Sequence, residues 1–217
     1  MTSDTFPYKL YLVTDEKACL GRDFFWVVEE ALRGGVDLVQ LREKHLSEKD
    51  FIYKAQKLKA LCEKYSVPLI INDHASVAKA VQANGLHIGQ SDEKMEVVKE
   101  MLGHIFPVGL SLEREAELSN KASDEAWYFG VSPIFSTPTK ADTYTEWGLE
   151  GIKRLRGITP KPLVAIGNIK ITNAREVMEA GADCLAVVSG ICSAPSPGKA
   201  AEEFRNEIDR NVNLSGF

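Results

Sequence analysis

The sequence predicts a single-domain (β/α)8 barrel, and three observations support this fold class. Eight short apolar runs alternate along the chain with longer amphipathic segments. Most of the runs show little polar–apolar alternation, as expected for parallel strands that are buried on both faces. A helix-to-strand turn of small residues recurs at 31–37, 80–85 and 177–183, which favours βαβ units. Eight such units in 217 residues fit a closed barrel better than a doubly wound open sheet, which is the structural alternative.

The apolar runs and the segments between them define the expected elements. Strands are predicted over 10–14, 38–41, 68–72, 85–88, 108–111, 127–131, 163–166 and 184–189, and helices over 23–33, 47–64, 74–83, 93–102, 113–121, 148–156, 172–180 and 197–210. Ser47, with an acid three residues on, is a predicted N-cap. One domain is expected to cover residues 1–217, with 1–8 and 211–217 as flexible tails. Active sites of such barrels lie at the rim where the strands end.

Composition argues against several classes of protein. The hydrophobic fraction of 44% and the charged fraction of 26% are ordinary globular values. A net charge of −5 without a basic run argues against a nucleic-acid partner, and no apolar stretch approaches the length of a membrane span. With no CxxC pair and no recognisable signal peptide, we expect a cytoplasmic protein with free thiols at Cys19, Cys62, Cys184 and Cys192. The sequence leaves open whether the barrel forms a homo-oligomer.

Two cations follow the second predicted strand. Side chains of a strand alternate between its faces, so Gln40, Arg42 and Lys44 share one face, while Leu41 and Glu43 point the other way. The alternative is that Arg42 and Lys44 are ordinary solvated surface charges. Their shared face at the end of an apolar strand favours an anion-binding role, which suits an enzyme acting on phosphorylated small molecules.

Two aspartates follow the third and fourth predicted strands. Asp73 and Asp92 each have a simple interpretation as N-caps of the next helix. Neighbouring parallel strands would bring both carboxylates to the same rim, close to Arg42. Carboxylate oxygens are ligands of Mg²⁺, so we favour a shared magnesium site over capping.

Later strand ends offer a second anion site. The loop 132–147 carries Thr137, Thr139 and Lys140, and it is longer than most strand-to-helix connections, which favours a binding loop or lid. Gly167 and the turn 188–190 follow the last two strands, where such barrels commonly bind phosphate. The four histidines show no ligand spacing, so a zinc site is not expected. No hydrolase triad can be recognised either.

Seven segments, in this order, resemble the thiamine phosphate synthases. They are residues 10–15, 40–44, 71–73, 85–90, 133–140, 165–167 and 181–189, and the resemblance runs from residue 10 to about residue 205. It implies a TIM barrel enzyme, a transferase that joins 4-amino-2-methyl-5-(diphosphomethyl)pyrimidine to a thiazole phosphate. Such an enzyme uses Mg²⁺ and releases pyrophosphate, with the carbon–oxygen bond breaking largely before the thiazole nitrogen attacks.

The resemblance implies roles for the matching residues. Asp73 and Asp92 would hold Mg²⁺, and the catalytic residues would be Arg42, Lys44, Ser111 and Lys140. Substrate contacts are implied for the whole segments 40–44 and 137–140 and for single positions elsewhere. These residues are Gln40, Leu41, Arg42, Glu43, Lys44, Asn72, Ser111, Thr137, Pro138, Thr139, Lys140, Asn168, Val188 and Ser189.

Within that set, Gln40, Arg42, Lys44 and Asn72 would contact the pyrimidine diphosphate. Ser111 and Lys140 would contact the pyrimidine or its leaving group, and Thr137, Thr139, Val188 and Ser189 the thiazole phosphate.

Some positions depart from the family pattern. Asn168 stands where the family has a second glycine beside the thiazole phosphate, His74 replaces a frequent arginine, and Ser132 a frequent glycine. The alternative function is a thiazole tautomerase-like or non-catalytic paralogue that binds thiazole or thiamine phosphate. The tautomerase relies on a histidine at a position that corresponds to Glu113 here, which speaks against that alternative.

Overall fold

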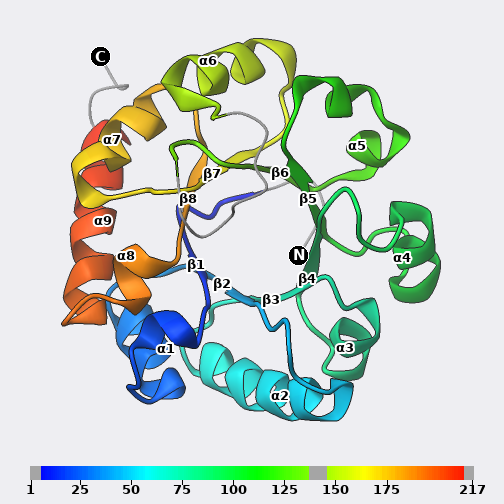
Figure 1. Cartoon of the computed structure of the whole chain (residues 1–217), viewed down its shortest axis with the longest axis vertical. Coiled ribbons are helices and arrows are strands. Elements are labelled where there is room, and N and C mark those ends of the chain that lie inside the picture. Colours follow the sequence, from blue (N-terminus) through cyan, green and yellow to red (C-terminus); the bar gives the residue numbers. More distant parts are fainter. Residues whose placement is uncertain (1–5, 137–145, 213–217) are drawn as a thin grey trace.

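The computed structural model describes residues 6–136 and 146–212, and it contains a closed parallel barrel (Figure 1). Strands follow one another around the barrel in sequence order, and β8 closes it by pairing with β1. The strands are β1 (Leu10–Val13), β2 (Leu38–Leu41), β3 (Leu69–Asn72), β4 (Gly85–Ile88), β5 (Val108–Leu112), β6 (Tyr128–Val131), β7 (Leu163–Ile166) and β8 (Cys184–Val187). All eight predicted strands are confirmed to within two residues at each end, so the doubly wound alternative is wrong.

Helices surround the barrel in Figure 1. They are α1 (Phe24–Arg33), α2 (Glu48–Lys64), α3 (Ala75–Ala80), α4 (Met95–Leu102), α5 (Lys121–Glu125), α6 (Gly148–Ile158), α7 (Ile171–Glu179), α8 (Ser189–Cys192) and α9 (Pro197–Val212), with 3-10 turns η1 (Lys17–Cys19) and η2 (Glu115–Ser119). Ser47 caps α2 as predicted, since its side chain accepts from Asp50 N at 3.2 Å. The expected fifth helix is split into η2 and α5, and both η1 and α8 were missed.

Strand residues alternate between two apolar layers, although the sequence of each strand hardly alternates. Outward-facing residues such as Leu12, Leu41 and Ile71 are fully or almost fully buried against the helices. Inward-facing residues such as Leu38 and Ile70 fill the barrel itself. Both faces of every strand are therefore covered, which explains why the runs are continuously apolar.

Aromatic rings close the amino-terminal end of the barrel. Phe6 lies 5.0 Å from Trp127 and 5.2 Å from Tyr128 between ring centroids, and Tyr8 lies 6.0 Å from Trp127. Phe6 and Tyr8 fall within the predicted tail over residues 1–8, yet their rings pack against apolar surface at this end of the barrel; residues 1–5 lie outside the described part. At the other end, α9 runs to Val212, past the predicted tail boundary at 211.

Candidate active site

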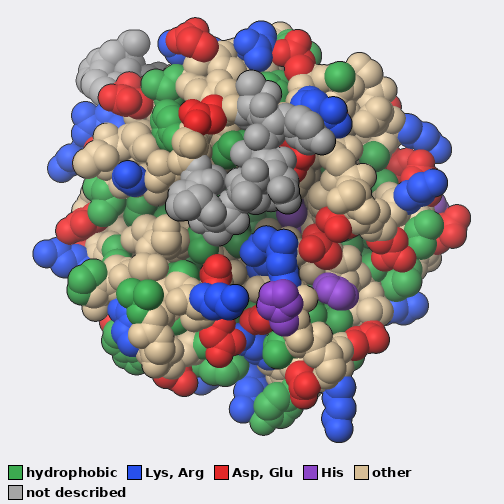
Figure 2. Space-filling view, viewed as in Figure 1, with side chains coloured by type: hydrophobic (Ala, Val, Ile, Leu, Met, Phe, Trp, Pro, Cys, Tyr) green, Lys and Arg blue, Asp and Glu red, His purple; other side chains and the backbone are tan. Residues whose placement is uncertain are grey.

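Charged side chains gather where β2 and β3 end. The backbone N–H of Arg42, just after β2, donates to Thr14 Oγ1 at 3.3 Å, which ties it to the end of β1. Asp73, just after β3, is held by its own N–H, which donates to the His87 carbonyl of β4 at 2.8 Å. Figure 2, viewed down the barrel, shows basic, acidic and histidine side chains together near the centre of this view.

Asp73 and Asp92 lie close enough for hydrogen bonding between their carboxyl groups to act on the pKa of Asp73. Burial, this hydrogen bonding and the charge of Asp92 raise the pKa of Asp73 to about 6, while Arg42 and Asn72 oppose the rise. Two acids in contact, with a guanidinium near enough to act on one of them, confirm the predicted clustering of the rim charges.

The capping interpretation of the two aspartates is wrong. The N-cap residues of α3 and α4 are His74 and Lys94, and neither helix has a side-chain cap. Asp92 instead accepts from the N–H of Gly89 at 2.7 Å, which turns its carboxylate back toward the strand end. Asp73 has a left-handed backbone with φ 63°, which aspartate tolerates better than most residues.

This acid pair fits a hard divalent cation. Two carboxylates in contact repel each other when both are ionised, and oxygen coordination to a cation such as Mg²⁺ removes that penalty. No group of three or more His, Cys, Asp or Glu side chains that could hold a metal occurs within residues 6–136 and 146–212. A cation held by Asp73 and Asp92 would therefore take its other ligands from substrate or water, as is usual for Mg²⁺.

The segment 40–44 divides between two faces as the strand geometry predicts. Gln40 points into the barrel, where it is 4% exposed and donates to the Tyr11 hydroxyl at 2.8 Å. Leu41 is buried in the layer between strands and helices, and Glu43 forms an ion pair with Lys54 of α2. Strand alternation turns the Leu41 and Glu43 side chains toward the helices, so a contact of either residue with substrate would be made by its backbone; these two contacts stay predictions. Lys44 is exposed beyond the strand end.

Two predicted polar residues line the inside of the rim. Asn72 ends β3, is 6% exposed and lies beside Asp73, whose pKa it lowers. Ser111 is half-buried in β5, its Oγ 3.0 Å from His87 Nε2, and its carbonyl accepts from Gln90 Nε2 at 2.7 Å. No role was predicted for His87, although its place inside a predicted strand was a signal.

A second corner of the rim follows β7 and β8. Gly167 has φ 114°, and a Cβ there would lie 2.8 Å from Cα of Pro133, so only glycine allows this close approach. Asn168 also has a left-handed backbone, with φ 53°, and its Nδ2 donates to the Ser136 carbonyl at 2.8 Å. Ser189 is the exposed first residue of α8 and Val188 its half-buried N-cap. The other predicted residues of this corner lie outside the described part of the chain: Thr137, Pro138, Thr139 and Lys140.

Arg22, which the sequence did not single out, joins the β1–α1 loop to the end of α8. Its guanidinium donates to the carbonyls of Cys19 at 2.9 Å, Ala194 at 2.6 Å and Cys192. Three bonds from one rigid fork fix two rim loops that are far apart in sequence. A charged residue after Gly21 in a loop of this length was the available signal.

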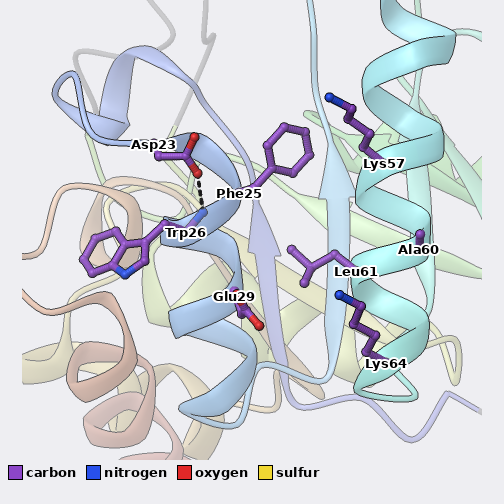
Figure 3. Close-up of a pocket in the computed structure, with 8 residues that line it drawn as sticks. All are labelled: Asp23, Phe25, Trp26, Glu29, Lys57, Ala60, Leu61 and Lys64. Carbon is purple, nitrogen blue, oxygen red and sulfur yellow. Dashed lines mark hydrogen bonds between the residues drawn. The ribbon is translucent and has the colours of Figure 1, made fainter.

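A hollow of about 390 Å³ lies away from this rim, between α1 and α2 (Figure 3). Phe25, Trp26 and Leu61 contribute apolar surface to it, and Lys57 and Lys64 line it from α2. It contains none of the predicted site residues.

The described chain and its site define a class of protein. A closed (β/α)8 barrel with a cation and two neighbouring acids at the strand ends suits an enzyme that acts on phosphorylated small molecules. The family model described as thiamine monophosphate synthase matches residues 10–191, and the chain belongs to this family. It is therefore a transferase.

Curated relatives and solved structures agree with this assignment. The thiamine-phosphate synthase of Albidiferax ferrireducens is 48% identical over 201 residues, which cover 93% of this chain and 92% of the relative. That of Clostridium acetobutylicum is 45% identical over 204 residues, covering 94% and 96%. The thiamine phosphate pyrophosphorylase structure from Pyrococcus furiosus superposes with a TM-score of 0.87 at 32% identity, covering 95% of this chain and 98% of that one.

A more distant structure shows the fold alone. A 3-hexulose-6-phosphate synthase superposes with a TM-score of 0.67 at 18% identity. No helix within the described residues is long and apolar enough to cross a membrane.

Proposed function

We propose that this chain condenses 4-amino-2-methyl-5-(diphosphomethyl)pyrimidine with 4-methyl-5-(2-phosphoethyl)thiazole, or its carboxylated form, to give thiamine phosphate and pyrophosphate. The observation that carries the proposal is the cluster of Arg42, Asp73 and Asp92 at one rim of the barrel. A guanidinium beside two acids suits a metal-bound diphosphate better than it suits a neutral substrate. The relatives named as thiamine-phosphate synthases support the choice of substrates.

The rim residues would serve the leaving group. Bound Mg²⁺, held by Asp73 and Asp92, would supply positive charge to the diphosphate. Arg42 and Lys44 would neutralise charge that develops on the departing oxygens, and this preorganised stabilisation is commonly the largest contribution to catalysis. In the dissociative route, the carbon–oxygen bond breaks first and leaves a methylene cation stabilised by the amino group of the pyrimidine. No strong general base is then required.

Inward-facing residues would hold the heterocycles. Gln40, Asn72 and Ser111 offer amide and hydroxyl groups inside the rim, next to the charged cluster. The thiazole phosphate would bind at the corner formed by Asn168, Val188 and Ser189, together with the undescribed Thr137 and Thr139. Binding both partners side by side lowers the entropic cost of their encounter.

The test is direct synthesis. Purified protein is incubated with both substrates and Mg²⁺, and thiamine phosphate and pyrophosphate are measured by mass spectrometry and a phosphate-release assay. Omission of each substrate in turn controls for contaminants. Absence of product above background with authentic substrates contradicts the proposal. Tight thiazole-phosphate binding by calorimetry in that case supports the non-catalytic alternative.

A further inference from the structure

A chain of polar side chains crosses the barrel interior from β2 to β5. Gln40 Nε2 donates to the Tyr11 hydroxyl at 2.8 Å, and the Tyr11 and Tyr128 hydroxyls lie 3.0 Å apart. The Tyr128 hydroxyl lies 3.0 Å from His87 Nδ1, and His87 Nε2 lies 3.0 Å from Ser111 Oγ. Four consecutive contacts therefore connect two residues that the proposed function assigns to the pyrimidine.

Glycines on β5 and β6 make room for this chain. A Cβ at Gly109 would lie 2.1 Å from Cζ of Tyr128, and a Cβ at Gly130 would lie 2.9 Å from Cε1 of His87. The rings of Tyr128 and His87 stack, with centroids 5.6 Å apart and planes 18° apart. Any larger residue at Gly109 would displace the Tyr128 phenol, so the observed position of this ring requires glycine on β5.

Counting protons identifies the donor and the acceptor in each hydrogen bond of this series of side chains. An amide nitrogen only donates, so the Tyr11 oxygen accepts from Gln40 and its single proton is left for Tyr128. Tyr128 then donates to His87 Nδ1, and a neutral imidazole with Nδ1 as acceptor carries its proton on Nε2. His87 therefore donates to Ser111 Oγ. The opposite direction would leave the Tyr11 proton without an acceptor in this chain, a costly outcome at a side chain 1% exposed.

The phenols are suited to this arrangement because they stay neutral. Burial raises the pKa of Tyr11 and of Tyr128 well above its ordinary value. Each hydroxyl thus keeps the one proton that the direction requires.

We infer that Tyr11, Tyr128 and His87 are positioning residues, which together hold Gln40 Oε1 as an acceptor and the Ser111 hydroxyl as a donor toward the substrate. The inference rests on the proposed function, since it takes Gln40 and Ser111 as pyrimidine contacts. An aminopyrimidine presents both an N–H donor and ring-nitrogen acceptors, so it has a partner for the acceptor at Gln40 and one for the donor at Ser111. The chain would fix that pattern before the substrate arrives, and would disfavour a pyrimidine with a carbonyl in place of the amino group.

A double-mutant cycle tests whether Tyr128 acts through Ser111. Tyr128→Phe keeps the ring and removes two contacts of the chain, so we expect kcat/KM to fall about 3- to 10-fold, the scale of one neutral hydrogen bond. In a Ser111→Ala background the same substitution should change kcat/KM less than about 2-fold. Tyr53→Phe, at a tyrosine 60% exposed on α2, is the matched control and should have no effect. Equal losses on both backgrounds would overturn the inference.

A second measurement needs no activity. In ¹⁵N-histidine NMR spectra of the wild-type protein, with His87 assigned through His87→Gln, the ring should be the neutral Nε2–H tautomer. Tyr128→Phe should shift it toward Nδ1–H or a mixture, while Tyr53→Phe should not. A wild-type ring protonated at Nδ1 overturns the proton direction even if Tyr128→Phe does not fold.

The two proposals fail differently. If wild-type protein makes no thiamine phosphate but its His87 tautomer is as expected, the proposed function fails, while the inferred direction of the hydrogen bonds from Gln40 to Ser111 stands. If wild-type protein is active and Tyr128→Phe equals it in kcat/KM and in tautomer, the inference fails alone.

Discussion

Replacing Asp73 by asparagine should stabilise the metal-free protein at neutral pH. Burial and the contact with Asp92 raise the pKa of Asp73 to about 6, against an ordinary value of 3.8. The folded protein therefore binds a proton more tightly than the unfolded chain does. Its stability falls as the pH rises from about 4 to above 6, and the full penalty applies at neutral pH. An asparagine side chain at this position would carry no charge and would avoid this penalty.

The magnitude follows from the gap between the two pKa values. At about 1.36 kcal/mol per pH unit, the gap gives an upper bound of about 3 kcal/mol. Asp73 is only partly buried, so solvent screening reduces the expected gain to roughly 1–2 kcal/mol. Asparagine also suits the left-handed backbone at this position, but that contribution does not depend on pH. The pH-dependent part is therefore the diagnostic quantity.

The assay is urea unfolding of wild type and Asp73→Asn in EDTA at several pH values between 4 and 7.5. The stability difference should be near its minimum at pH 4 and should grow to roughly 1–2 kcal/mol in favour of the variant at pH 7.5. Saturating Mg²⁺ should stabilise the wild type, by about 2.7 kcal/mol at a concentration 100 times Kd, and leave the variant unchanged. A stability difference that is constant across the pH range would refute the reasoning. A stability advantage of the variant over wild type that is smaller at pH 7.5 than at pH 4 would refute it as well.

Further predictions concern the rim and the barrel interior. Arg42→Ala should lower kcat by about 10²–10³, whereas Arg33→Ala, at an exposed pair on α1, should leave steady-state turnover unchanged; near-normal turnover of the first would disprove the assignment. EDTA should abolish turnover and Mg²⁺ should restore it, with Asp92→Asn requiring at least about tenfold more Mg²⁺ in a titration of initial rates; an enzyme that turns over fully in EDTA contradicts the metal site. Gly109→Ala should cost about 2–3 kcal/mol of unfolding free energy because its Cβ would overlap Tyr128, while Gly157→Ala, with no atom within 4 Å of its Cβ, should cost nothing in the same denaturation experiment.

The fold could be predicted because each strand carries its own signal. Parallel strands in a closed barrel are buried on both faces, so runs such as 38–41 and 163–166 are continuously apolar and their limits are predicted correctly. The missed elements are short turns whose geometry depends on tertiary partners. Just before η1, Asp15 accepts from Lys17 N at 2.8 Å, and Arg22 anchors the loop to Cys192 at the end of α8. Neither contact can be recognised from periodicity.

The candidate site could be predicted where charged residues directly follow the apolar residues of a strand. Arg42, Asp73 and Asp92 stand out because charges directly after apolar runs must lie at the rim. Tyr11 and Tyr128 did not stand out, because an aromatic residue inside a strand is usually a core residue. Inward-facing glycines offered the missing signal: Gly109 and Gly130 weaken their strands and are explained only by the rings they accommodate.

The two halves of the site obtain their order by opposite means. At the rim, Asp73 and Asp92 touch at an electrostatic cost that a bound cation removes, so this region should respond to pH, salt and metal. Inside the barrel, Tyr11 and Tyr128 are neutral members of a chain in which each contact has both a donor and an acceptor, so the orientation of Gln40 and Ser111 needs no ligand to be established. A loss of activity in EDTA with an unchanged His87 tautomer would separate these two contributions in a single sample.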